Sequence, residues 1–465
     1  MQKINKIYRG LIYILPAVLF FSYYPVIKLG ASESMNFELS LPLIWLVVFD
    51  VVAFGIMIKK KILFKDFKRK WIWLLFPGFL TVSVLWSLNS LRGLLTVGVL
   101  WLIYFAVNAF FSLRSILKEA GAKEVFWKMF FGSALVVCGW CLVQCVLDLA
   151  GLPREGSLMC AGCTYKMFGF PHPNGFAIEP QFMGNLLLAP AIASEWFGLK
   201  KNKQYFWLFF IFAVTIFLTF SRGAIYAFVV AMIFMTVFEW VRQKDWRVCK
   251  TFLIIAAAFL FTLNLQGVMA QVSPTNDTYA DGVAKVINQL SLGVIDIRES
   301  KSEILPEEAN ASTLETVDEE AKEDKAVFDG YVEESTDTRV RLTDAALTVW
   351  RKDFKTIMFG VGLGGAGQAL YVNGLSPAPK EIVQNQYASL LLETGLVGVV
   401  LMVMTLVLIV RAVYKNPARE VIWTLMVAYG ITVCFFAGLP NALHIYLLPA
   451  ILMVTLGDGK SLYRK

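Results

Sequence analysis

Charged residues are scarce in this chain. Only 17% of its 465 residues are Asp, Glu, Lys or Arg, whereas 57% are hydrophobic and the mean hydropathy is +0.61. A soluble domain is nearer a quarter charged and half apolar. The composition therefore excludes an ordinary soluble protein. It predicts an all-α fold, a polytopic bundle of membrane helices, because a helix satisfies its own backbone hydrogen bonds in lipid.

Histidine and paired cysteine are also rare. The chain has two histidines, His172 and His444, and seven cysteines. Cys160 and Cys163 lie close together in a loop, but no second Cys pair or His pair is near them, so a zinc site would lack ligands. If this loop faces an oxidising compartment, we expect a disulfide between Cys160 and Cys163 that pins the loop, rather than a metal or redox site.

The net charge of +8 does not indicate a nucleic-acid partner. The basic residues cluster in short loops between apolar segments, which is typical of membrane topology. We predict about 12 transmembrane helices, each with an apolar run close to the ~20 residues that cross the hydrocarbon. The predicted spans are Gly10–Ile27, Leu41–Ile58, Trp71–Leu88, Gly93–Phe111, Phe126–Leu149, Phe182–Gly198, Tyr205–Phe220, Gly223–Trp240, Phe252–Met269, Tyr387–Val410, Val421–Gly438 and Leu443–Leu456.

Lysine and arginine are divided unequally between the two sides of these helices. If the N-terminus is cytoplasmic, the inside segments hold 26 basic residues and the short outside loops hold five. Cytoplasmic loops carry the excess positive charge in membrane proteins. The imbalance predicts that both termini are cytoplasmic and that the long loop is outside. No small-residue cleavage site follows Pro25, so residues 1–27 are interpreted as a retained first helix.

The sequence divides into three parts. Residues 1–269 hold the first nine predicted spans, residues 270–384 form an extracytoplasmic loop, and residues 385–465 hold the last three spans. Within the loop, residues 298–337 are acidic and poor in aromatics, which is typical of a disordered insert. Order is expected to resume at Thr338, where apolar residues recur at helical spacing.

The tenth predicted span has a polar outer end. The run from Gln384 to Gly398 contains amides and the carboxylate of Glu393, and it passes without a break into the apolar segment that ends at Val410. Polar groups are costly against lipid, so we expect them to face a cavity. A long polar loop beside this helix end predicts a site at one surface of the membrane.

Four arginines are expected at the outer boundary, against the positive-inside bias: Arg92, Arg222, Arg339 and Arg341. Guanidinium groups bind phosphate oxygens in bidentate fashion and stay charged at any relevant pH. The alternative for a lone boundary arginine is head-group anchoring or a local carboxylate partner. For Arg222, set in a short junction between two spans, phosphate binding is favoured.

Four further features were considered for a chemical role. His172 can titrate as a base, and Glu179, at the start of a span, is a costly carboxylate unless it is paired, for instance with an arginine. His444 more readily fits a capping or packing role. The Gly360–Gly365 segment superficially resembles a nucleotide-binding loop, but no strand precedes it and no Lys-Ser/Thr follows it.

Short motifs are spread along most of the chain. They are Trp86-Ser87, the stretch from Asn174 to Pro180, Ser221-Arg222-Gly223, Arg339 ahead of Gly360-Val361-Gly362, and Asn385 with Glu393 and Gly395-Leu396-Val397-Gly398. In this order the motifs resemble the O-antigen ligase and O-antigen polymerase family.

The resemblance implies a twelve-helix glycosyltransferase of the bacterial inner membrane that needs no cofactor, metal or nucleotide sugar. It would take a glycan from an undecaprenyl diphosphate carrier and join it to a lipid or glycan hydroxyl at the outer face, in polysaccharide or lipopolysaccharide biosynthesis. Its partners would be the lipid-linked donor, the acceptor and membrane lipids. Arginines would stabilise the charge that grows on the leaving diphosphate. By resemblance this role goes to Arg222 and Arg339, and then to Arg341 and Arg92.

One position departs from the family's pattern. Ligases of this family usually carry a His-Asn pair, and the His acts on the acceptor, whereas this chain has Gln384 before Asn385. Glutamine cannot take up a proton at neutral pH. Gln384 and Asn385 would then orient the acceptor hydroxyl, with His172 or Glu179 as the base. Otherwise the reaction relies mainly on the leaving group, or the protein is inactive or acts on something else.

A transporter or flippase for a lipid-linked glycan is the alternative from another class. Transporters typically show paired repeats and helices broken near the membrane midplane. No convincing repeat relates the two halves of this sequence, and its polar features gather on one face. Both points favour an enzyme, while ligase and polymerase are not separated.

Overall fold

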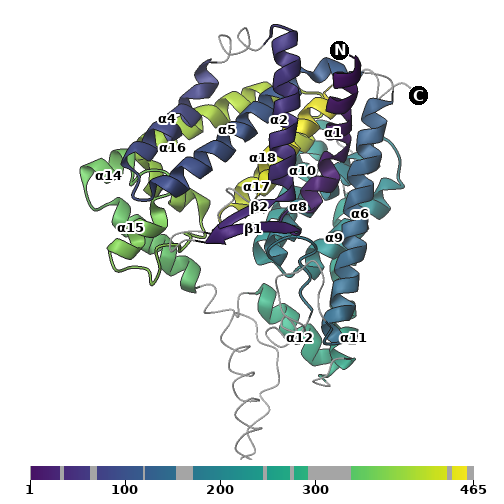
Figure 1. Ribbon diagram of the computed structural model, residues 1–465. Helices are drawn as coiled ribbons and strands as arrows, with labels where there is room; N and C mark the ends of the chain where they lie inside the picture. The colour runs from purple at the N-terminus through teal and green to yellow at the C-terminus, as the bar shows by residue number, and fades with distance from the viewer. Residues whose placement is uncertain are drawn as a thin grey trace, which may run out of the picture.

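Helices make up nearly all of the computed structural model (Figure 1), which describes residues 2–31, 36–62, 71–118, 121–152, 171–243, 249–272, 277–291, 337–436 and 442–457. The bundle helices are α1 (Gln2–Phe20), α2 (Leu41–Lys59), η1 (Trp71–Leu74) with α4 (Leu75–Ser83) and η2 (Val84–Trp86), α5 (Ser90–Ser112), η3 (Arg114–Lys118), α6 (Ala122–Leu149), α8 (Pro180–Lys200), α9 (Tyr205–Leu218), α10 (Arg222–Gln243), α11 (Cys249–Gln271), α16 (Gln386–Tyr414), α17 (Arg419–Thr432) and α18 (Leu443–Leu456). The helical fold class is therefore confirmed.

Six of the described helices are long and apolar enough to cross a membrane: α2, α5, α6, α10, α11 and α16. Three shorter apolar helices, Trp71–Trp86, α9 and α18, add to them. Helix covers most of each predicted span, but the number of 12 crossings stays a prediction. Figure 1 shows that α1 begins and α18 ends at one end of the bundle, while α12 (Tyr279–Leu290) lies at the other.

Helix α8 is the centre of the bundle. All its residues from Pro180 to Gly198 except Phe182 are buried, and it packs against α9, α17 and α10. Gly184 permits α8 to pack closely against α10, because a Cβ added there would lie 2.6 Å from the Cβ of Ala224 in α10. Because α8 is enclosed, its first turn is surrounded by the ends of other helices, and this is where the candidate site forms.

The first predicted span ends earlier than expected, which corrects the boundary at Ile27. Helix α1 ends at Phe20, and Val26–Ala31 (β1) pairs antiparallel with Asn36–Ser40 (β2). The physical reason is Pro25, which disfavours helical geometry at the residue before it and has no N–H to continue a helix. The hairpin is the only strand pairing within the described residues.

Buried carboxylates tie the opposite end of α8 to its neighbours. Lys200 Nζ lies 2.7 Å from Glu239 Oε2 of α10, and both side chains are largely buried. Glu195 Oε1 accepts a hydrogen bond from Thr251 Oγ1 of α11 at 2.8 Å. Trp196 Nε1 donates to Glu420 Oε1 of α17 at 3.0 Å. These contacts join four helices through charged groups that lipid could not solvate.

Removing the cation from this cluster is expected to destabilise the fold. Lys200→Met removes the ammonium group that pairs with the buried Glu239, which should lower the free energy of unfolding by ~3 kcal/mol because one member of a buried ion pair is lost. Thermal unfolding of the purified protein in detergent measures the change. The matched control is Lys128→Met, which breaks the exposed Lys128–Glu124 pair and should cost under ~1 kcal/mol. Equal shifts in the two variants would contradict the prediction.

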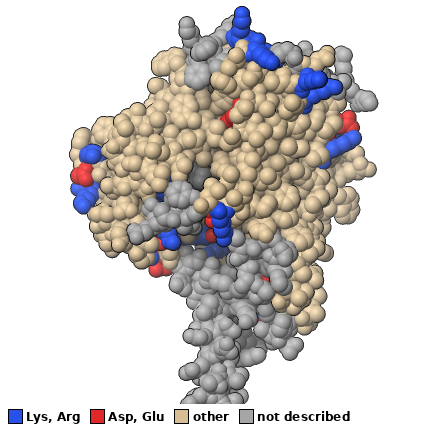
Figure 2. Space-filling model, viewed as in Figure 1, with Lys and Arg blue, Asp and Glu red and all other residues tan. Residues whose placement is uncertain are grey.

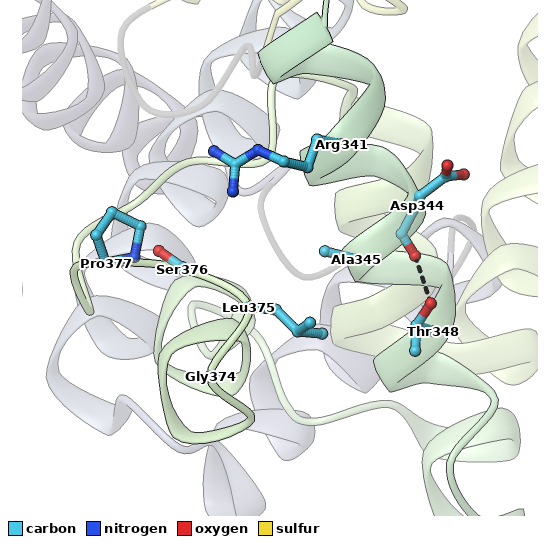
Figure 3. Close-up of a pocket in the computed structure, with 8 residues that line it drawn as sticks. All are labelled: Arg341, Asp344, Ala345, Thr348, Gly374, Leu375, Ser376 and Pro377. Atoms are coloured by element: carbon cyan, nitrogen blue, oxygen red, sulfur yellow. Dashed lines mark hydrogen bonds between the residues drawn. The ribbon is translucent and has the colours of Figure 1, made fainter.

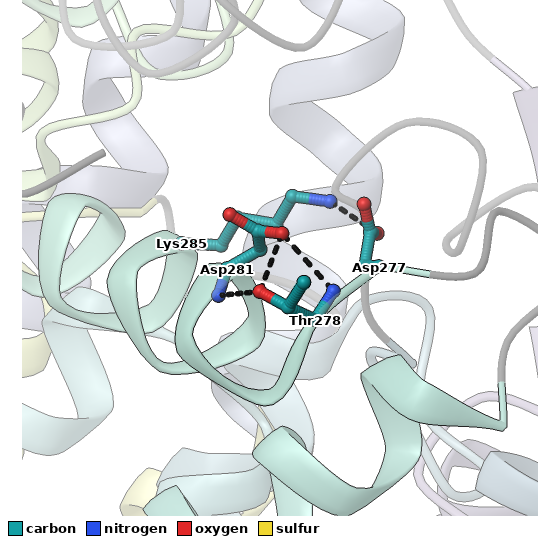
Figure 4. A network of polar contacts seen from close by, with 4 residues as sticks. All are labelled: Asp277, Thr278, Asp281 and Lys285. Atoms are coloured by element: carbon teal, nitrogen blue, oxygen red, sulfur yellow. Dashed lines mark hydrogen bonds and ion pairs between the residues drawn. The ribbon is translucent and has the colours of Figure 1, made fainter. Parts of the chain in front are cut away.

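Contacts with α10 and α11 hold helix α12 against the end of α11. Tyr226 Oη donates to the carbonyl of Leu290 at 2.7 Å, and Tyr279 packs where a side chain at Gly267 would collide with it. A capping box joins Thr278 and Asp281 at the first turn (Figure 4). In the same figure Lys285 Nζ lies 2.6 Å from Asp277 Oδ2. The start of the long loop is therefore ordered.

A second, smaller core lies in the segment that leads to α16. It contains the helix at residues 337–350, α14 (Phe354–Phe359) and α15 (Ala366–Val372). The apolar face of helix 337–350 packs on α15 and on the first turns of α16; the buried residues are Leu342, Ala345, Ala346, Val349, Ala366, Ala369, Leu370, Val383, Ala388 and Leu392. This packing confirms that order resumes near Thr338.

Helix α16 is broken, which corrects the expectation of an uninterrupted tenth span. Gly395 has φ 61° and ψ −167°, a backbone conformation close to glycine-only. Sequence periodicity hides the break because apolar residues continue on both sides of it. The carbonyls of Leu392 and Glu393 accept hydrogen bonds from the amides of Val361 and Gly362, each at 2.9 Å. The glycine-rich loop thus replaces the missing helical donors, as backbone at membrane depth requires.

The cap of α14 makes a pH-dependent contribution to this segment. Asp353 accepts hydrogen bonds from the amide and hydroxyl of Thr356, and these bonds lower the pKa of the Asp353 carboxyl. A carboxyl with a depressed folded pKa stabilises above its unfolded pKa of ~3.9 and loses that effect as the pH falls through the folded value.

We therefore expect residues 354–359 to lose amide-exchange protection as the pH falls from about 5 to about 2, after correction for intrinsic exchange. Asp353→Asn should keep a cap, since Asn caps helices as well as Asp does, but should abolish the pH dependence. The same pH profile in both proteins would show that another group controls this turn.

Candidate functional site

Arg222 begins α10 directly after a tight turn from α9. Phe220 holds this turn with a positive φ of 44°, and the amide of Ser221 donates to Thr219 Oγ1 at 3.4 Å. Arg222 itself is only 9% exposed. A Cβ added at Gly223 would lie 3.1 Å from Gln181 Nε2 in the first turn of α8. Arg222 therefore enters the bundle beside the first turn of α8.

His172 lies against the same turn. Its ring centroid is 6.2 Å from that of Phe220, and the side chain is buried. The loop that carries it is fixed at Gly175, whose amide donates to Gln144 Oε1 at 2.8 Å and whose carbonyl accepts from Gln144 Nε2 at 2.9 Å. Gly175 has φ 57°, so a glycine suits this bend. The fold thus brings His172 next to the Ser221–Arg222 junction.

Glu179 caps the same end of α8 and is coupled to an arginine from the long loop. Its side chain reaches the solvent, but the protein around it removes enough water to raise the pKa of the carboxyl. The positive charge of Arg339 acts in the opposite direction. This places Arg339, in helix 337–350, within electrostatic range of Glu179. Two candidate residues separated by 160 positions therefore lie within electrostatic range of each other at one end of α8.

Arg341 faces a different space from Arg339, although only one residue separates them. It lines an open pocket of about 500 Å³ between helix 337–350 and the turn at residues 374–377. Figure 3 shows its guanidinium extending across the pocket toward Ser376 and Pro377, while the Asp344 carboxylate points away from that turn. Positions 339 and 341 differ because residues two apart project from opposite sides of a helix.

Arg92 lies within electrostatic range of a carboxylate of the chain itself. It lies in the first turn of α5, where Asn89 Oδ1 accepts a hydrogen bond from its amide at 3.1 Å. Its charge acts on Glu393, just before the break in α16. Glu393 Oε1 also accepts a hydrogen bond from the amide of Ala366 at 3.4 Å. Arg92 thus belongs to the environment of the glycine-rich loop.

Asn385 forms the N-cap of α16. Its Oδ1 accepts hydrogen bonds from the amides of Tyr387 and Ala388 at 3.0 and 3.1 Å. The amide of the next residue, Gln386, donates to the carbonyl of Val433 at 2.9 Å. Gln384, just before the cap, is half-buried.

The end of α17 connects these groups with the Arg222 turn. Val433 receives the hydrogen bond from the start of α16, and Phe435, two residues later, packs where a Cβ at Gly223 would approach it to 3.0 Å. The first turns of α8, α10 and α16 therefore share one neighbour. Figure 2 shows basic and acidic side chains around a recess below the β1–β2 hairpin, and a broad surface above it with few charged side chains.

The predicted site residues thus fall into several groups. His172 and Arg222 adjoin the α9–α10 turn, and Glu179 faces Arg339 at the same end of α8. Gln384 and Asn385 reach this region through α17, while Arg92 and Arg341 have other surroundings; Cys160 and Cys163 lie outside the described residues. His444 is buried in α18 against Tyr429. Among the described residues, no group of three His, Cys, Asp or Glu side chains could hold a metal ion.

Sequence reasoning gave no role to Ser87 and Glu393. Ser87 Oγ donates to the carbonyl of Leu363 at 2.8 Å, so it supports the glycine-rich loop from the side of α5. For Glu393 the sequence did contain a signal, because a carboxylate inside an apolar run predicts a partner. The partners of Glu393 come from the first turn of α5 and from the glycine-rich loop, and no local pattern identifies them.

Comparison with known families gives one match. The family model described as O-antigen ligase matches residues 207–403, from the start of α9 to beyond the break in α16. The matched region includes Arg222, Arg339, Arg341 and the Gln384–Asn385 pair, whereas Arg92, His172 and Glu179 precede it. This match confirms the resemblance based on the motifs. No curated protein sequence matches the chain.

Proposed function

Because residues 207–403 of this chain match the O-antigen ligase family model, we propose that it moves a glycan from an undecaprenyl diphosphate carrier to a lipid or glycan hydroxyl at the outer face of the inner membrane. The apolar helices and the family agree with a multi-pass bacterial membrane protein engaged in polysaccharide biosynthesis. The carrier, the acceptor and the orientation with both termini inside are parts of the proposal.

The observation that carries this proposal is the coupling of Glu179 with Arg339 at the end of α8 where Arg222 enters the bundle. Arg222 comes from the bundle and Arg339 from the long loop, so a diphosphate bound between them would be held from two sides. A guanidinium that is already fixed by the fold stabilises growing charge without reorganisation, and the effect is large where water is scarce. A lipid diphosphate brings this charge to the membrane surface.

The reaction breaks one bond and forms one bond. The acceptor oxygen attacks the anomeric carbon of the donor sugar, and the carbon–oxygen bond to the carrier diphosphate breaks, with its electron pair remaining on the diphosphate. The acceptor proton passes to a base. Glu179 is the first choice because burial raises the pKa of its carboxyl, which makes it a better proton acceptor than an ordinary carboxylate. His172, beside the Arg222 turn, is the alternative, and Gln384 and Asn385 orient the hydroxyl.

This assignment predicts a pH dependence. The carboxylate of Glu179 is available above its pKa, so transfer should fall as the pH drops through that raised pKa. Glu179→Gln should lower kcat about 100-fold and remove the acidic limb of the profile. Initial rates with a polyprenyl diphosphate oligosaccharide between pH 4 and pH 9 measure both effects. Glu124→Gln, at an exposed carboxylate, is the control. An unchanged acidic limb would move the role to His172.

The product identifies the reaction. The purified protein is incubated with a polyprenyl diphosphate oligosaccharide, with and without a candidate acceptor lipid, and the products are separated by mass. Glycan on the acceptor indicates a ligase, and longer carrier-linked chains indicate a polymerase. Intact donor under all conditions contradicts glycan transfer by this protein.

One observation favours the transporter class as a second candidate. The break in α16 at Gly395 is the kind of interruption that transporters use at their binding sites. Here loop backbone fills the break and bonds to Leu392 and Glu393, which fits a structural joint better than an open binding site. Movement of an unmodified lipid-linked glycan between the leaflets of a proteoliposome would support the transporter instead.

A further inference from the structure

We propose that Glu393 and Arg92 are a positioning pair, which holds the loop at residues 360–365 inside the break of α16 and thereby fixes the helix that carries Arg339. The catalytic consequence rests on the proposed function, whereas the structural part does not. The loop is called the glycine wedge below.

The glycine wedge fits the break without room for a side chain. A Cβ added at Gly360 would lie 2.3 Å from the carbonyl carbon of Glu393, and one added at Gly395 would lie 2.4 Å from the carbonyl group of Met358. Real Cβ atoms do not approach backbone so closely, so the two segments touch main chain to main chain. The hydrogen bonds from Val361 and Gly362 to α16 close this contact.

The other side of the wedge rests on the junction between η2 and α5. Ser87 Oγ donates to the carbonyl of Leu363 at 2.8 Å, and the amide of Leu363 lies 3.4 Å from Ser83 Oγ. A Cβ at Gly364 would lie 2.5 Å from the amide nitrogen of Gly93, the residue after Arg92. The wedge therefore connects α16 with the start of α5.

Glu393 is the charged group at the centre of this joint. Its carboxylate accepts backbone hydrogen bonds from Gly364 and Ala366, and the charge of Arg92 acts on it from α5. A carboxylate that joins three segments in a water-poor place is stabilised by the nearby cation and by both amides. Arg92 therefore has a carboxylate of the protein itself within electrostatic range.

The joint determines where Arg339 lies. The wedge continues into α15, and α15 packs through Ala366, Ala369 and Leu370 on helix 337–350. That helix presents Arg339 to Glu179. If the wedge loosens, Arg339 loses its fixed position although neither Arg92 nor Glu393 contacts substrate. A displacement of about 1 Å can cost about 100-fold in rate.

The test compares Arg92→Ala, Glu393→Ala, Glu393→Gln and the double Ala variant of the full-length protein in nanodiscs. Amide exchange of residues 337–366 is the structural readout, and kcat and KM for a polyprenyl diphosphate oligosaccharide are the catalytic ones. Arg351→Ala, an exposed arginine after the same helix, is the matched control. We expect faster exchange in both single Ala variants, and a double variant no worse than the worse single one, because the two groups act as a unit.

Kinetics separate positioning from phosphate binding. A positioning pair predicts a fall in kcat of about 100-fold for Arg92→Ala and Glu393→Ala with little change in KM, and a smaller effect for Glu393→Gln, which keeps the acceptor oxygen for the amides. The inference is overturned if exchange is unchanged in all variants, or if Arg92→Ala alone raises KM while Glu393→Ala matches the wild type. If the wild type transfers no glycan, the proposed function fails, and the exchange data still test the wedge.

Discussion

Replacing Arg222 by alanine is expected to abolish glycan transfer while the protein still expresses and folds. The guanidinium is largely buried at the start of α10, beside the first turn of α8 and the ring of Phe220, which His172 contacts. Loss of one preorganised donor to a developing anion costs about 10²–10³ in kcat, and loss of a full charge at a leaving diphosphate should reach the upper end. Transfer from a purified polyprenyl diphosphate oligosaccharide measures the effect.

Two further variants serve as comparisons for Arg222→Ala. Arg222→Lys keeps the charge but cannot form the planar, bidentate contact with phosphate oxygens, so intermediate activity is expected. Arg114→Ala removes an exposed arginine of η3 and should leave activity unchanged. Size-exclusion profiles and melting curves of all three exclude misfolding as the cause. Full activity in Arg222→Ala would remove the diphosphate role from this residue.

Gly395→Ala is expected to destabilise the protein more than any other single methyl addition considered. The backbone conformation at Gly395 costs an L-residue ~1–3 kcal/mol. The new Cβ would also lie 2.4 Å from the carbonyl of Met358, so the wedge must shift. That shift would break the hydrogen bonds from Val361 and Gly362, worth ~1 kcal/mol each. A total loss of ~4 kcal/mol follows.

The control is an alanine at a glycine with free space around it. Gly98 lies inside α5, and a Cβ added there meets nothing within 4 Å. Gly98→Ala should therefore change stability by no more than ~1 kcal/mol, in the favourable direction that helix propensity predicts. Thermal unfolding in the same detergent compares the two. Similar melting points for both variants would show that the break in α16 is not rigidly required.

Some of the candidate site could be predicted from residues alone. Arg222 and Arg339 were predicted at the outer boundary, where a guanidinium group needs an anionic partner or a ligand, and the family resemblance assigned both to the diphosphate. The fold adds that Arg339 lies within electrostatic range of Glu179, because helix 337–350 packs on α15 and α16. Arg341, two positions later, points into a separate pocket. Sequence spacing cannot make that distinction until the helix has a neighbour.

The sequence by itself determined that this protein is a helical membrane bundle and, to within a few residues, where most of its helices lie, because apolar runs and the scarcity of charge are local properties that lipid makes decisive. The tertiary structure alone decided that α16 breaks at Gly395, that the wedge repairs its backbone hydrogen bonds, and that Arg92 lies within electrostatic range of Glu393. The physical reason is that a broken helix is stable only when distant backbone occupies the gap. Hydropathy along the chain contains no information about such a contact.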